Sequence, residues 1–319
     1  MAIFTNAKAM EMAKELRRCR SMREVVALLR RVASTLPVTK PGASQKKRWR
    51  KAARRAGRAK PMGWRESMLA LADALESGGV YYAIFAMHGN KKLPFVAFSV
   101  LPFVTCPGMG ACGEDCYSRK AWRTPGGFLR QFQNTALMMF GKRLIINAFR
   151  DLPEDITFRL YVDGDFDSPV TVRFWFNMLN QRPDIECYGY SKSWELLLSY
   201  DGKYPSNYTL NISSGSKYDG DREMVEAIKH LAITRNWFLA VPVDKRFARK
   251  EKGYNRYRDP EYHRAVRASA QALGYLKVLS CPGTCGDCVV HDGENAHACG
   301  AKRADGSHVF NGVVAIGIH

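Results

Sequence analysis

The sequence has no long hydrophobic run. Its most apolar stretch, Leu93 to Val104, is shorter than the ~20 residues that span a bilayer, and it contains Pro94 and Pro102. The basic N-terminal segment is interrupted by glutamates, which leaves no apolar core for a secretory signal peptide. We therefore expect a cytoplasmic protein with no membrane partner, in which the nine cysteines form no structural disulfides.

Acidic residues are scarce in one part of the chain. The 319 residues include 49 Lys and Arg against 30 Asp and Glu, a formal net charge of +19. Residues 1–65 hold 19 of these bases and only three acids, whereas residues 66–319 are nearly neutral. A basic arm on a neutral globule is typical of a protein that binds a polyanion, of which DNA and RNA are the commonest. A solvated tail that only aids solubility has the same composition.

The basic arm, residues 1–65, is predicted to have two parts. Apolar residues recur every three or four positions over residues 6–35, which predicts a helix that ends before Pro37. Residues 40–65 hold 11 Lys or Arg and no acid, with tryptophans between them. We expect this second part to order on a phosphate backbone while its indoles stack on bases. The expected nucleic-acid contacts are Lys46, Lys47, Arg48, Trp49, Arg50, Lys51, Arg54, Arg55 and Arg58.

Two enzyme classes lack their motifs in this sequence. None of the seven histidines forms the His-x-His pair of a rolling-circle nuclease, and the P-loop motif of an ATPase is missing. Without such a metal pair, Tyr117, Tyr188 and Tyr190 are better interpreted as the aromatic walls of a site than as nucleophiles.

Residues 66–319 form the second predicted domain. After a short helix at 67–75, β-rich runs alternate with helical stretches, which is typical of parallel βαβ units. Strands are expected at 81–87, 94–104, 156–162, 185–190, 208–212, 237–241, 275–279 and 313–318. Helices are expected at 128–150, 169–181, 193–200, 222–234 and 260–273. The pattern predicts an α/β fold, a partial or complete (β/α) barrel with Cys-rich rim loops, entered through a hairpin that turns at 89–92. An open doubly wound sheet fits the same alternation.

Seven of the nine cysteines fall into two groups, spaced C-x5-C-x3-C and C-x3-C-x2-C-x10-C. They are Cys106, Cys112 and Cys116 in the early group, and Cys281, Cys285, Cys288 and Cys299 in the late group. Thiolates at such spacings on Gly-rich loops are typical metal ligands. The groups fit one or two [4Fe-4S] clusters, and zinc, with His291 and His297 as further ligands, is the alternative metal. Cys19 and Cys187 stand alone and are expected to be small buried residues.

In a parallel sheet, functional groups gather where the strands end. In a closed barrel the first and last strands are also neighbours, so we expect the two cysteine groups to lie close together. Asp165 and Lys192, each after a predicted strand, are the candidate catalytic residues. Asp163, Asp165 and Asp167 are expected to project together, although Asp167 and Ser168 also suit the cap of the next helix. The candidate cofactor-binding residues are Gly164, Asp165, Ser213, Ser214 and Gly215.

These motifs carry a resemblance to known families. A three-Cys loop after an early strand, followed by a Gly-acid turn after a later one, resembles the radical S-adenosylmethionine superfamily. The early cysteine loop, Gly-Asp-Phe at 164–166, Tyr-Ser-Lys-Ser at 190–193 and the terminal Cys cluster are similar to an uncharacterised phage and plasmid gene-product family, over roughly residues 90–319. The resemblance implies that the early cysteines hold a cluster whose open iron takes the amino-acid end of S-adenosylmethionine, with Gly164 and Asp165 near its methionine part.

The sequence departs from the superfamily pattern in two places. The usual C-x3-C-x2-C spacing occurs in the late cysteine group, so either the early group is a variant or the two groups exchange roles. The turn at 163–165 is Asp-Gly-Asp where the superfamily has Gly-Gly-Glu. We expect an iron–sulfur, radical-S-adenosylmethionine-like protein of a phage or plasmid, in the host cytoplasm, that acts on nucleic acid or a nucleotide. The alternative is a non-catalytic nucleic-acid-binding replication or packaging factor whose loops are stapled by metal.

Overall fold

The computed structural model describes residues 4–38, 50, 63–87, 92–114, 116–249, 251, 253–289, 295–303 and 305–318. Its α-helices are α1 (Asn6–Arg18), α2 (Met22–Ser34), α4 (Trp64–Glu76), α5 (Pro125–Phe140), α6 (Lys142–Arg150), α7 (Pro169–Asn180), α8 (Trp194–Leu198), α9 (Arg222–Lys229) and α10 (Pro260–Ala272). Its strands are β1 (Val96–Ala97), β2 (Thr157–Arg159), β3 (Glu186–Ser191), β4 (Tyr208–Ser213), β5 (Thr234–Pro242), β6 (Val278–Ser280), β7 (Cys288–Val289), β8 (Asn295–Ala296) and β9 (Val313–Ile318). Short 3-10 helices are η1 (Ala111–Gly113), η2 (Tyr117–Arg123), η3 (Lys245–Ala248) and η4 (Arg256–Arg258).

Seven of the strands form one sheet in the order β1-β2-β3-β4-β5-β9-β6, and every pair of neighbours is parallel. Strand β9, the last along the chain, is inserted between β5 and β6, where Val314 pairs with Phe238 on one side and Leu279 on the other. The predicted α/β fold with a parallel sheet is confirmed. The expectation that the last strand lies beside the first is wrong, because β9 lies inside the sheet.

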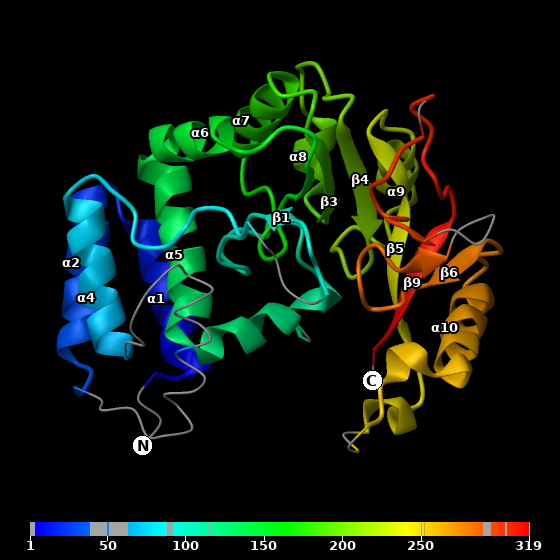
Figure 1. Cartoon of the computed structure of the whole chain (residues 1–319), viewed down its shortest axis with the longest axis horizontal. Helices are drawn as coiled ribbons and strands as arrows, with labels where there is room; N and C mark the ends of the chain where they lie inside the picture. The colour runs from blue at the N-terminus through cyan, green and yellow to red at the C-terminus, as the bar shows by residue number, and fades with distance from the viewer. Residues whose placement is uncertain are drawn as a thin grey trace.

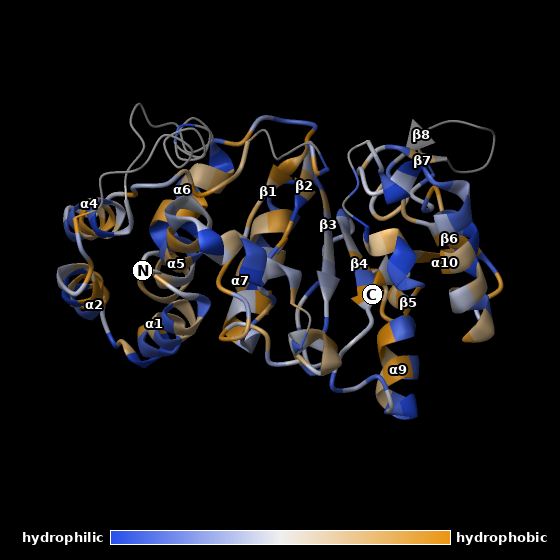
Figure 2. Ribbon diagram, turned by 90° about the horizontal axis from the view of Figure 1, so that it is seen from below, coloured by the Kyte–Doolittle hydropathy of each residue, from blue (hydrophilic) through white to orange (hydrophobic). Residues whose placement is uncertain are grey.

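The sheet has two different faces, because successive side chains of a strand point to opposite sides. The helix face packs on the surrounding helices through apolar residues such as Phe158, Leu210 and Trp237. The opposite face, here called the cysteine face, carries a second buried cluster. Its buried members are Leu93, Ala97, Tyr188, Cys288, Ala298, Cys299, Phe310 and Val314. Figure 2 shows α7 and α9 on one side of the sheet and the β7–β8 pair on the other.

The two edges of the sheet touch the same loop. Among the described residues no hydrogen bond joins β1 to β6, so strand pairing leaves both as edges. The amide of Cys285, in the loop after β6, nevertheless donates to the carbonyl of Lys92, just before β1, over 2.7 Å. The late cysteine loop therefore lies across the cysteine face from one edge to the other.

The N-terminal helices belong to the same core as the sheet. Figure 1 shows α1, α2 and α4 together at one end of the molecule, next to α5. Leu16 of α1, Leu29 of α2 and Leu71 of α4 are fully buried in the cluster that covers the helix face. The described part of residues 1–65 is thus packed against the rest of the protein, while the predicted domain boundary at residue 65 stays a prediction.

The single helix predicted at 6–35 is two helices in the structure. Ser21 begins α2, where its hydroxyl accepts from the amide of Glu24 over 3.3 Å. The Glu24 carboxylate accepts in turn from the amide of Arg20 over 2.9 Å. This reciprocal cap ends the helical run because it satisfies amides that a continuing helix would bond to carbonyls. The expectation of one helix is wrong here, although Ser-x-x-Glu signals the break.

Two other expected elements are shorter or broken. The helix predicted at 128–150 is split into α5 and α6 at Gly141, which caps the end of the first and the start of the second. The strand predicted at 94–104 is reduced to β1, because the amide of Leu101 donates to the hydroxyl of Thr135 rather than to a strand. The expected hairpin is a single antiparallel bridge between Ala86 and Ala97, and most of its turn lies outside the described residues.

A helix that crosses a bilayer must be both long and apolar. In the ranges that the structure covers, no helix has both properties.

Because the N-terminal helices share one core with the sheet, we predict that damage to either lowers the stability of both. Leu29→Ala removes a fully buried side chain from α2 and should cost about 2–5 kcal/mol. Thermal unfolding followed by circular dichroism should still show one transition at a lower temperature. Leu276→Ala, at a side chain that is 90% exposed, is the control and should change stability by less than about 0.5 kcal/mol. A separate early transition for the helices would contradict the shared core.

Candidate metal centre

The late cysteine group lies on the cysteine face, below the carboxyl ends of the strands. Cys281 follows β6 and its amide donates to the carbonyl of Ala315 in β9 over 2.8 Å. The thiol of Cys285 accepts from the hydroxyl of Tyr188 at 3.9 Å, in the middle of the sheet. The carbonyl of Cys299 accepts from the amide group of Asn211 in β4 over 2.7 Å. The expected rim position therefore holds for Cys281 only, because the loop turns down onto the buried face.

The thiols of the late group interact electrostatically with one another. Burial raises the pKa of Cys281 and of Cys288 from 9.0 to about 12, and the Cys299 thiol adds to the effect at both. Burial also raises the pKa of Cys285, again with a contribution from Cys299. None of the nine cysteines forms a disulfide. The four late cysteines are thus free and lie near one another, and burial favours the neutral thiol at Cys281, Cys285 and Cys288.

Two arginines point into the same region, and among the described residues neither forms an ion pair. Arg159 of β2 is 7% exposed, its Nη1 has no hydrogen-bond partner in the part of the chain that the structure describes, and its guanidinium lies 3.7 Å from the ring centre of Tyr190. Its charge lowers the pKa of the buried Asp163 carboxyl, which balances part of that charge. Its charge also lowers the pKa of Cys285. Arg235 of β5 is 5% exposed and its pKa is lowered by burial, an effect opposed by Cys299. A buried guanidinium that lacks a negative partner is costly.

The position of Arg235 depends on an irregularity in β5. Leu210 of β4 pairs with Thr234, but the next residue, Asn211, pairs with Asn236, so Arg235 is an extra residue. Such a bulge re-aims a side chain. The Arg235 guanidinium donates to Asn211 Oδ1 over 2.7 Å and to the carbonyl of Gly312 over 2.7 Å. The bulge therefore turns this arginine from the helix face to the cysteine face.

His297 is a further polar group of this region. It is 8% exposed and packs edge-on against Tyr188 and at a tilt against Phe95, with ring centres 4.1 and 4.9 Å apart. Neither ring nitrogen has a hydrogen-bond partner among the residues that the structure describes. Burial, together with the charges of Arg159 and Arg235, lowers its pKa to about 3. His297 is thus a neutral imidazole with free nitrogens, whereas His291 lies outside the described residues.

A single metal ion needs several ligand side chains around one position. Within the part of the chain that the structure describes, no three His, Cys, Asp or Glu side chains are placed to hold one metal ion between them. A four-iron cluster is wider than one ion and takes its thiolates from further apart. The positions of the described thiols therefore argue against a single zinc ion, and they do not decide about a four-iron cluster.

The early cysteine group lies at the carboxyl ends of β3 and β4. The amides of Gly110 and Cys112 both donate to the carbonyl of Gly215, over 3.0 and 3.2 Å. Gly108 lies so close to the chain that a Cβ there would be 1.7 Å from the carbonyl oxygen of Lys192. Only glycine fits this contact, so Cys-Pro-Gly at 106–108 fixes how the loop crosses the sheet end. The early loop follows β1 but is held by β3 and β4.

Lys192 and Asp165 flank the early thiols. Burial raises the pKa of Cys106 and of Cys112, and the ammonium of Lys192 lowers it at both. Asp165 and Cys116 raise both pKa values. These mutual effects place the three thiols near one another and near Lys192. The largest electrostatic contributions to these pKa values come from the same cysteine group or from its neighbours, in the early loop and in the late loop alike.

The three aspartates of the 163–167 turn do not project together. Asp163 accepts from Ser118 and from Gln131, and Asp167 forms an ion pair with Arg17 of α1 over 2.6 Å. The prediction of a shared cluster is therefore wrong, because each carboxylate has its own partners. The predicted capping is confirmed at Ser168, which forms a reciprocal capping box with Thr171 at the start of α7.

Asp165 is buried and all its close contacts are internal. Its carboxylate accepts from the hydroxyl of Ser191 and the amides of Phe166 and Lys192, each over 2.8 Å. Burial raises the pKa of Asp165 and these three bonds lower it. The carboxylate thus holds the turn after β3, the same turn from which the Lys192 side chain extends.

The turn at 213–216, expected to bind a cofactor, is bonded within the protein. Lys192 Nζ donates to Ser213 Oγ over 2.8 Å, and Ser214 Oγ accepts from the amide of Ala240 over 2.9 Å. The amides of Gly215 and Ser216 donate to the carboxylate of Asp219 over 2.6 and 3.2 Å. This turn therefore positions Lys192 and the early cysteine loop. The neighbouring Gly164 lies in the left-handed region, at φ +81°.

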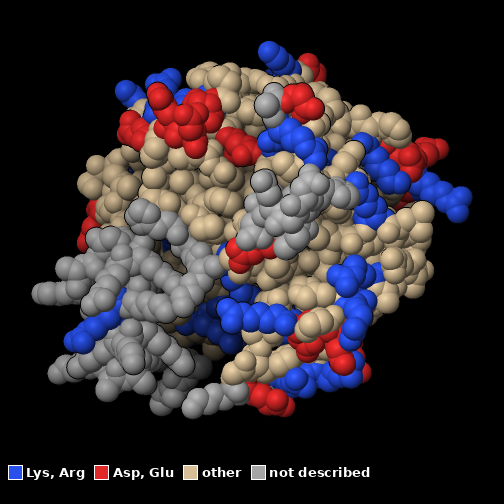
Figure 3. Space-filling view, turned by 45° about the vertical axis from the view of Figure 1, so that its right-hand side comes forward, with Lys and Arg blue, Asp and Glu red and all other residues tan. Residues whose placement is uncertain are grey.

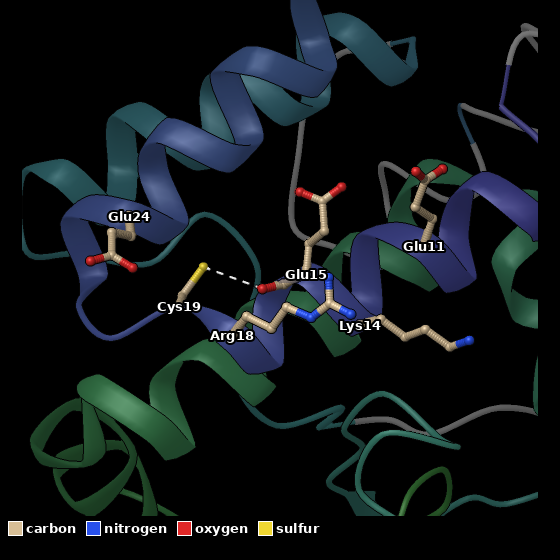
Figure 4. A pocket seen from close by; sticks show the side chains of 6 residues that line it. All are labelled: Glu11, Lys14, Glu15, Arg18, Cys19 and Glu24. Carbon is tan, nitrogen blue, oxygen red and sulfur yellow. Dashed lines mark hydrogen bonds between the residues drawn. The ribbon is translucent and has the colours of Figure 1, made fainter.

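The nucleic-acid contacts predicted in the basic arm lie outside the described residues, apart from Arg50, which is exposed. The helical part of the arm has a recess of about 390 Å³ at the junction of α1 and α2. Figure 4 shows that its lining mixes acidic and basic side chains around Cys19, whose thiol donates to the carbonyl of Glu15 over 3.6 Å. Cys19 is only half-buried, contrary to expectation, because it caps α1, while Cys187 is fully buried in β3 as predicted.

Sequence reasoning missed Arg159, Arg235 and Asn211 as parts of the late cysteine region. The alternation in 156–162 and 208–212 gives a signal for Arg159 and Asn211, since both interrupt apolar strands on the face opposite the helices. Nothing in the sequence signals the bulge that redirects Arg235. Tyr188 and Tyr190 lie against the guanidinium of Arg159, while the interpretation of Tyr117, Tyr188 and Tyr190 as the aromatic walls of a site stays a prediction.

The fold and site define an α/β protein with an all-parallel sheet and two cysteine groups. The chain belongs to the family described as Gene product 88, whose family model matches residues 83–304. The matched residues include both cysteine groups and leave out α1, α2 and β9. No curated protein and no solved structure was found to match the chain. The family part of the sequence resemblance is thus confirmed, while the likeness to radical S-adenosylmethionine proteins stays a prediction.

The raised thiol pKa values predict that the metal-free, reduced protein becomes less stable against unfolding at alkaline pH. Cys281 and Cys288 have a pKa of about 12 in the folded protein against 9.0 ordinarily, so the unfolded chain loses these protons first. Stability should therefore fall as pH rises from about 9 to about 12. Urea unfolding across this range should show a shallower fall for Cys281→Ala/Cys288→Ala. Val266→Ala, which removes a buried apolar side chain, is the control and should lower stability equally at every pH. An unchanged slope in the cysteine variant would show that these thiols are not the cause.

Proposed function

We propose that the chain is an iron–sulfur protein of the radical-S-adenosylmethionine type, encoded by a phage or plasmid, that acts on nucleic acid or on a nucleotide. The observation that carries the metal centre is the pair of buried guanidiniums, Arg159 and Arg235, beside the four late thiols. Four thiolates bring two more negative charges than a zinc ion or an oxidised four-iron cluster neutralises. Two unpaired arginines match that excess.

The donor set of the late group fits a fully ligated cluster. Cys281, Cys285, Cys288 and Cys299 supply four thiols, of which Cys288 and Cys299 are buried and Cys281 and Cys285 are half-buried. Thiolates are the usual ligands of such clusters. Binding would release the protons that these thiols hold in the metal-free protein.

The early group fits a cluster with one open position. It supplies three thiols, Cys106, Cys112 and Cys116, at the accessible end of the sheet, with the ammonium of Lys192 beside them. Such a cluster, when bound, supplies electrons. In the protein, Lys192 balances thiolate charge and offers a cation to the carboxylate of S-adenosylmethionine, while Asp165 and Ser213 fix where Lys192 points.

The nucleic-acid part of the proposal is supported by charge. Residues 1–65 carry 19 of the 49 Lys and Arg, and counterion release favours the binding of such a segment to DNA or RNA. The chemical step on that partner is assigned to the early centre, because it is the one at the strand ends where active sites of parallel sheets lie.

A second function is favoured by one observation. Asp165 and the turn at 213–216, the expected reactive and cofactor-binding groups, are bonded within the protein. This arrangement suits a non-catalytic nucleic-acid-binding factor in replication or packaging, in which zinc or iron–sulfur centres only hold the loops.

The deciding experiment is anaerobic purification with iron, sulfide and zinc analysis, followed by electron paramagnetic resonance of the dithionite-reduced protein. We expect iron and sulfide, and a spectrum that changes when S-adenosylmethionine is added. Cys285→Ala should lower the iron content through the late centre, and Cys112→Ala should remove the response to the cofactor. Cys19→Ala, at a thiol in neither group, is the matched control and should change neither. Zinc alone would overturn the iron–sulfur proposal, and an unresponsive iron spectrum would favour the binding factor.

The positive charge of Arg159 is expected to strengthen metal binding at the late cysteines. Arg159→Met keeps the bulk of the side chain but removes the positive charge next to Cys285, so the late centre should bind metal more weakly. Metal content after dialysis against a chelator should fall to less than about a tenth of the wild-type value. Arg130→Met is the control, since this arginine of α5 is partly buried and is not among the groups that shift the pKa of Cys281, Cys285 or Cys288. Equal metal retention in both variants would remove the support that Arg159 gives to the proposal.

A further inference from the structure

A second basic segment follows β5, far along the chain from the basic arm. Residues 245–267 hold nine Lys or Arg and three acids, within a region that is otherwise nearly neutral. The described part of this segment forms η3, η4 and α10. Figure 3, which brings this side of the molecule forward, shows Lys and Arg side chains along its right-hand part, with some acidic ones among them.

The segment forms a hollow of about 520 Å³ at the start of α10. Its lining, here called the arginine hollow, contains three guanidiniums and no acidic side chain. The lining residues are Tyr257, Arg258, Pro260, His263, Arg264 and Arg267. Arg258, Arg264 and Arg267 are exposed, and none of them makes an ion pair within the described chain.

The acids of the segment are already engaged. Glu261 pairs with Arg246 over 3.1 Å, and Glu251 with Arg249 over 3.5 Å. Asp259 caps α10, where its carboxylate accepts from the amide of Glu261 over 2.9 Å. These acids therefore already have other partners. The three exposed arginines of the hollow have no acidic partner in the described chain.

The arginine hollow adjoins the late cysteine loop. Gly283 lies against the ring of Tyr257, so closely that a Cβ there would be 2.5 Å from the ring. His263 makes a 2.8 Å hydrogen bond to Ser280, the residue before Cys281. Gly283 lies two residues from both Cys281 and Cys285. The elements that line the hollow thus also pack against the loop that carries two of the late thiols.

We propose that the arginine hollow binds the phosphodiester backbone of the nucleic acid and seats it beside the late cysteine loop. The inference rests on the proposed nucleic-acid partner and adds to it a contact surface outside the arm. Guanidiniums match phosphate oxygens with paired hydrogen bonds, whereas the Tyr257 ring already packs against Gly283 and has the ammonium of Lys92 4.9 Å from its centre. The contact is therefore to phosphate and independent of base sequence.

The test uses the full-length protein and fluorescent single-stranded DNA and RNA of mixed sequence. We compare Arg264→Glu/Arg267→Glu with Arg143→Glu/Arg222→Glu, a control with the same change in net charge at two exposed arginines on α6 and α9. The hollow variant should bind about tenfold or more weakly than the control, with the same loss for every sequence. The slope of affinity against salt should fall by about one for each phosphate contact removed.

Three results are distinguishable. A loss confined to the hollow variant supports the inference. If wild-type protein binds and both double variants bind alike, the hollow is not a contact surface, although the proposed partner stands. If wild-type protein binds neither DNA nor RNA, the proposed nucleic-acid function and this inference both fail. Thermal unfolding of the two variants is compared in parallel, since surface substitutions should leave both folded.

Discussion

The burial of two guanidiniums beside four thiols is the constraint on which the cysteine face depends. Arg159 and Arg235 come from strands on either side of β3 and β4, and both point to the face away from the helices. Without negative charge there, the cost of desolvating them would act against the fold. The tyrosines, the asparagine and the carbonyls around them lower this cost, and Asp163 balances part of the charge of Arg159. Under the proposed function, a bound metal–thiolate centre would supply further negative charge, so metal binding and the stability of this face would be linked.

The two cysteine groups lie on different parts of the sheet. The early loop lies across the carboxyl ends of β3 and β4, where its backbone bonds to the 213–216 turn and where Lys192 extends beside it. The late loop covers the buried face and touches both edges of the sheet. The early cysteines therefore lie at the carboxyl ends of the strands, and the late cysteines lie against the face of the sheet. The same division accounts for Asp165, which orders the turn that positions Lys192.

Much of this arrangement could be predicted from the sequence, and the failures have physical causes. Alternating β-rich and helical runs gave the parallel sheet, and the cysteine spacings marked both loops. The place of β9 could not be foreseen, because periodicity shows that a strand exists but not which strands it pairs with. The bulge at Arg235 could not be predicted either, because the register of a strand depends on the strand it pairs with. The scattered partners of Asp163, Asp165 and Asp167 arose because α1, η2 and β3 each bring a group that the alternation alone does not reveal.

The insertion of β9 between β5 and β6 has a consequence for the order of events during synthesis. Both cysteine groups leave the ribosome before this strand does, and the carbonyls of Phe310 and Gly312 that bond Arg235 are made only just before it. Until β9 is in place, no strand connects β5 to β6, and Val314 of β9 is missing from the buried cluster that contains Cys288 and Cys299. The nascent chain therefore completes its longest-range strand pairing only after both cysteine groups have been made, so under the proposed function metal would be delivered after translation rather than during it.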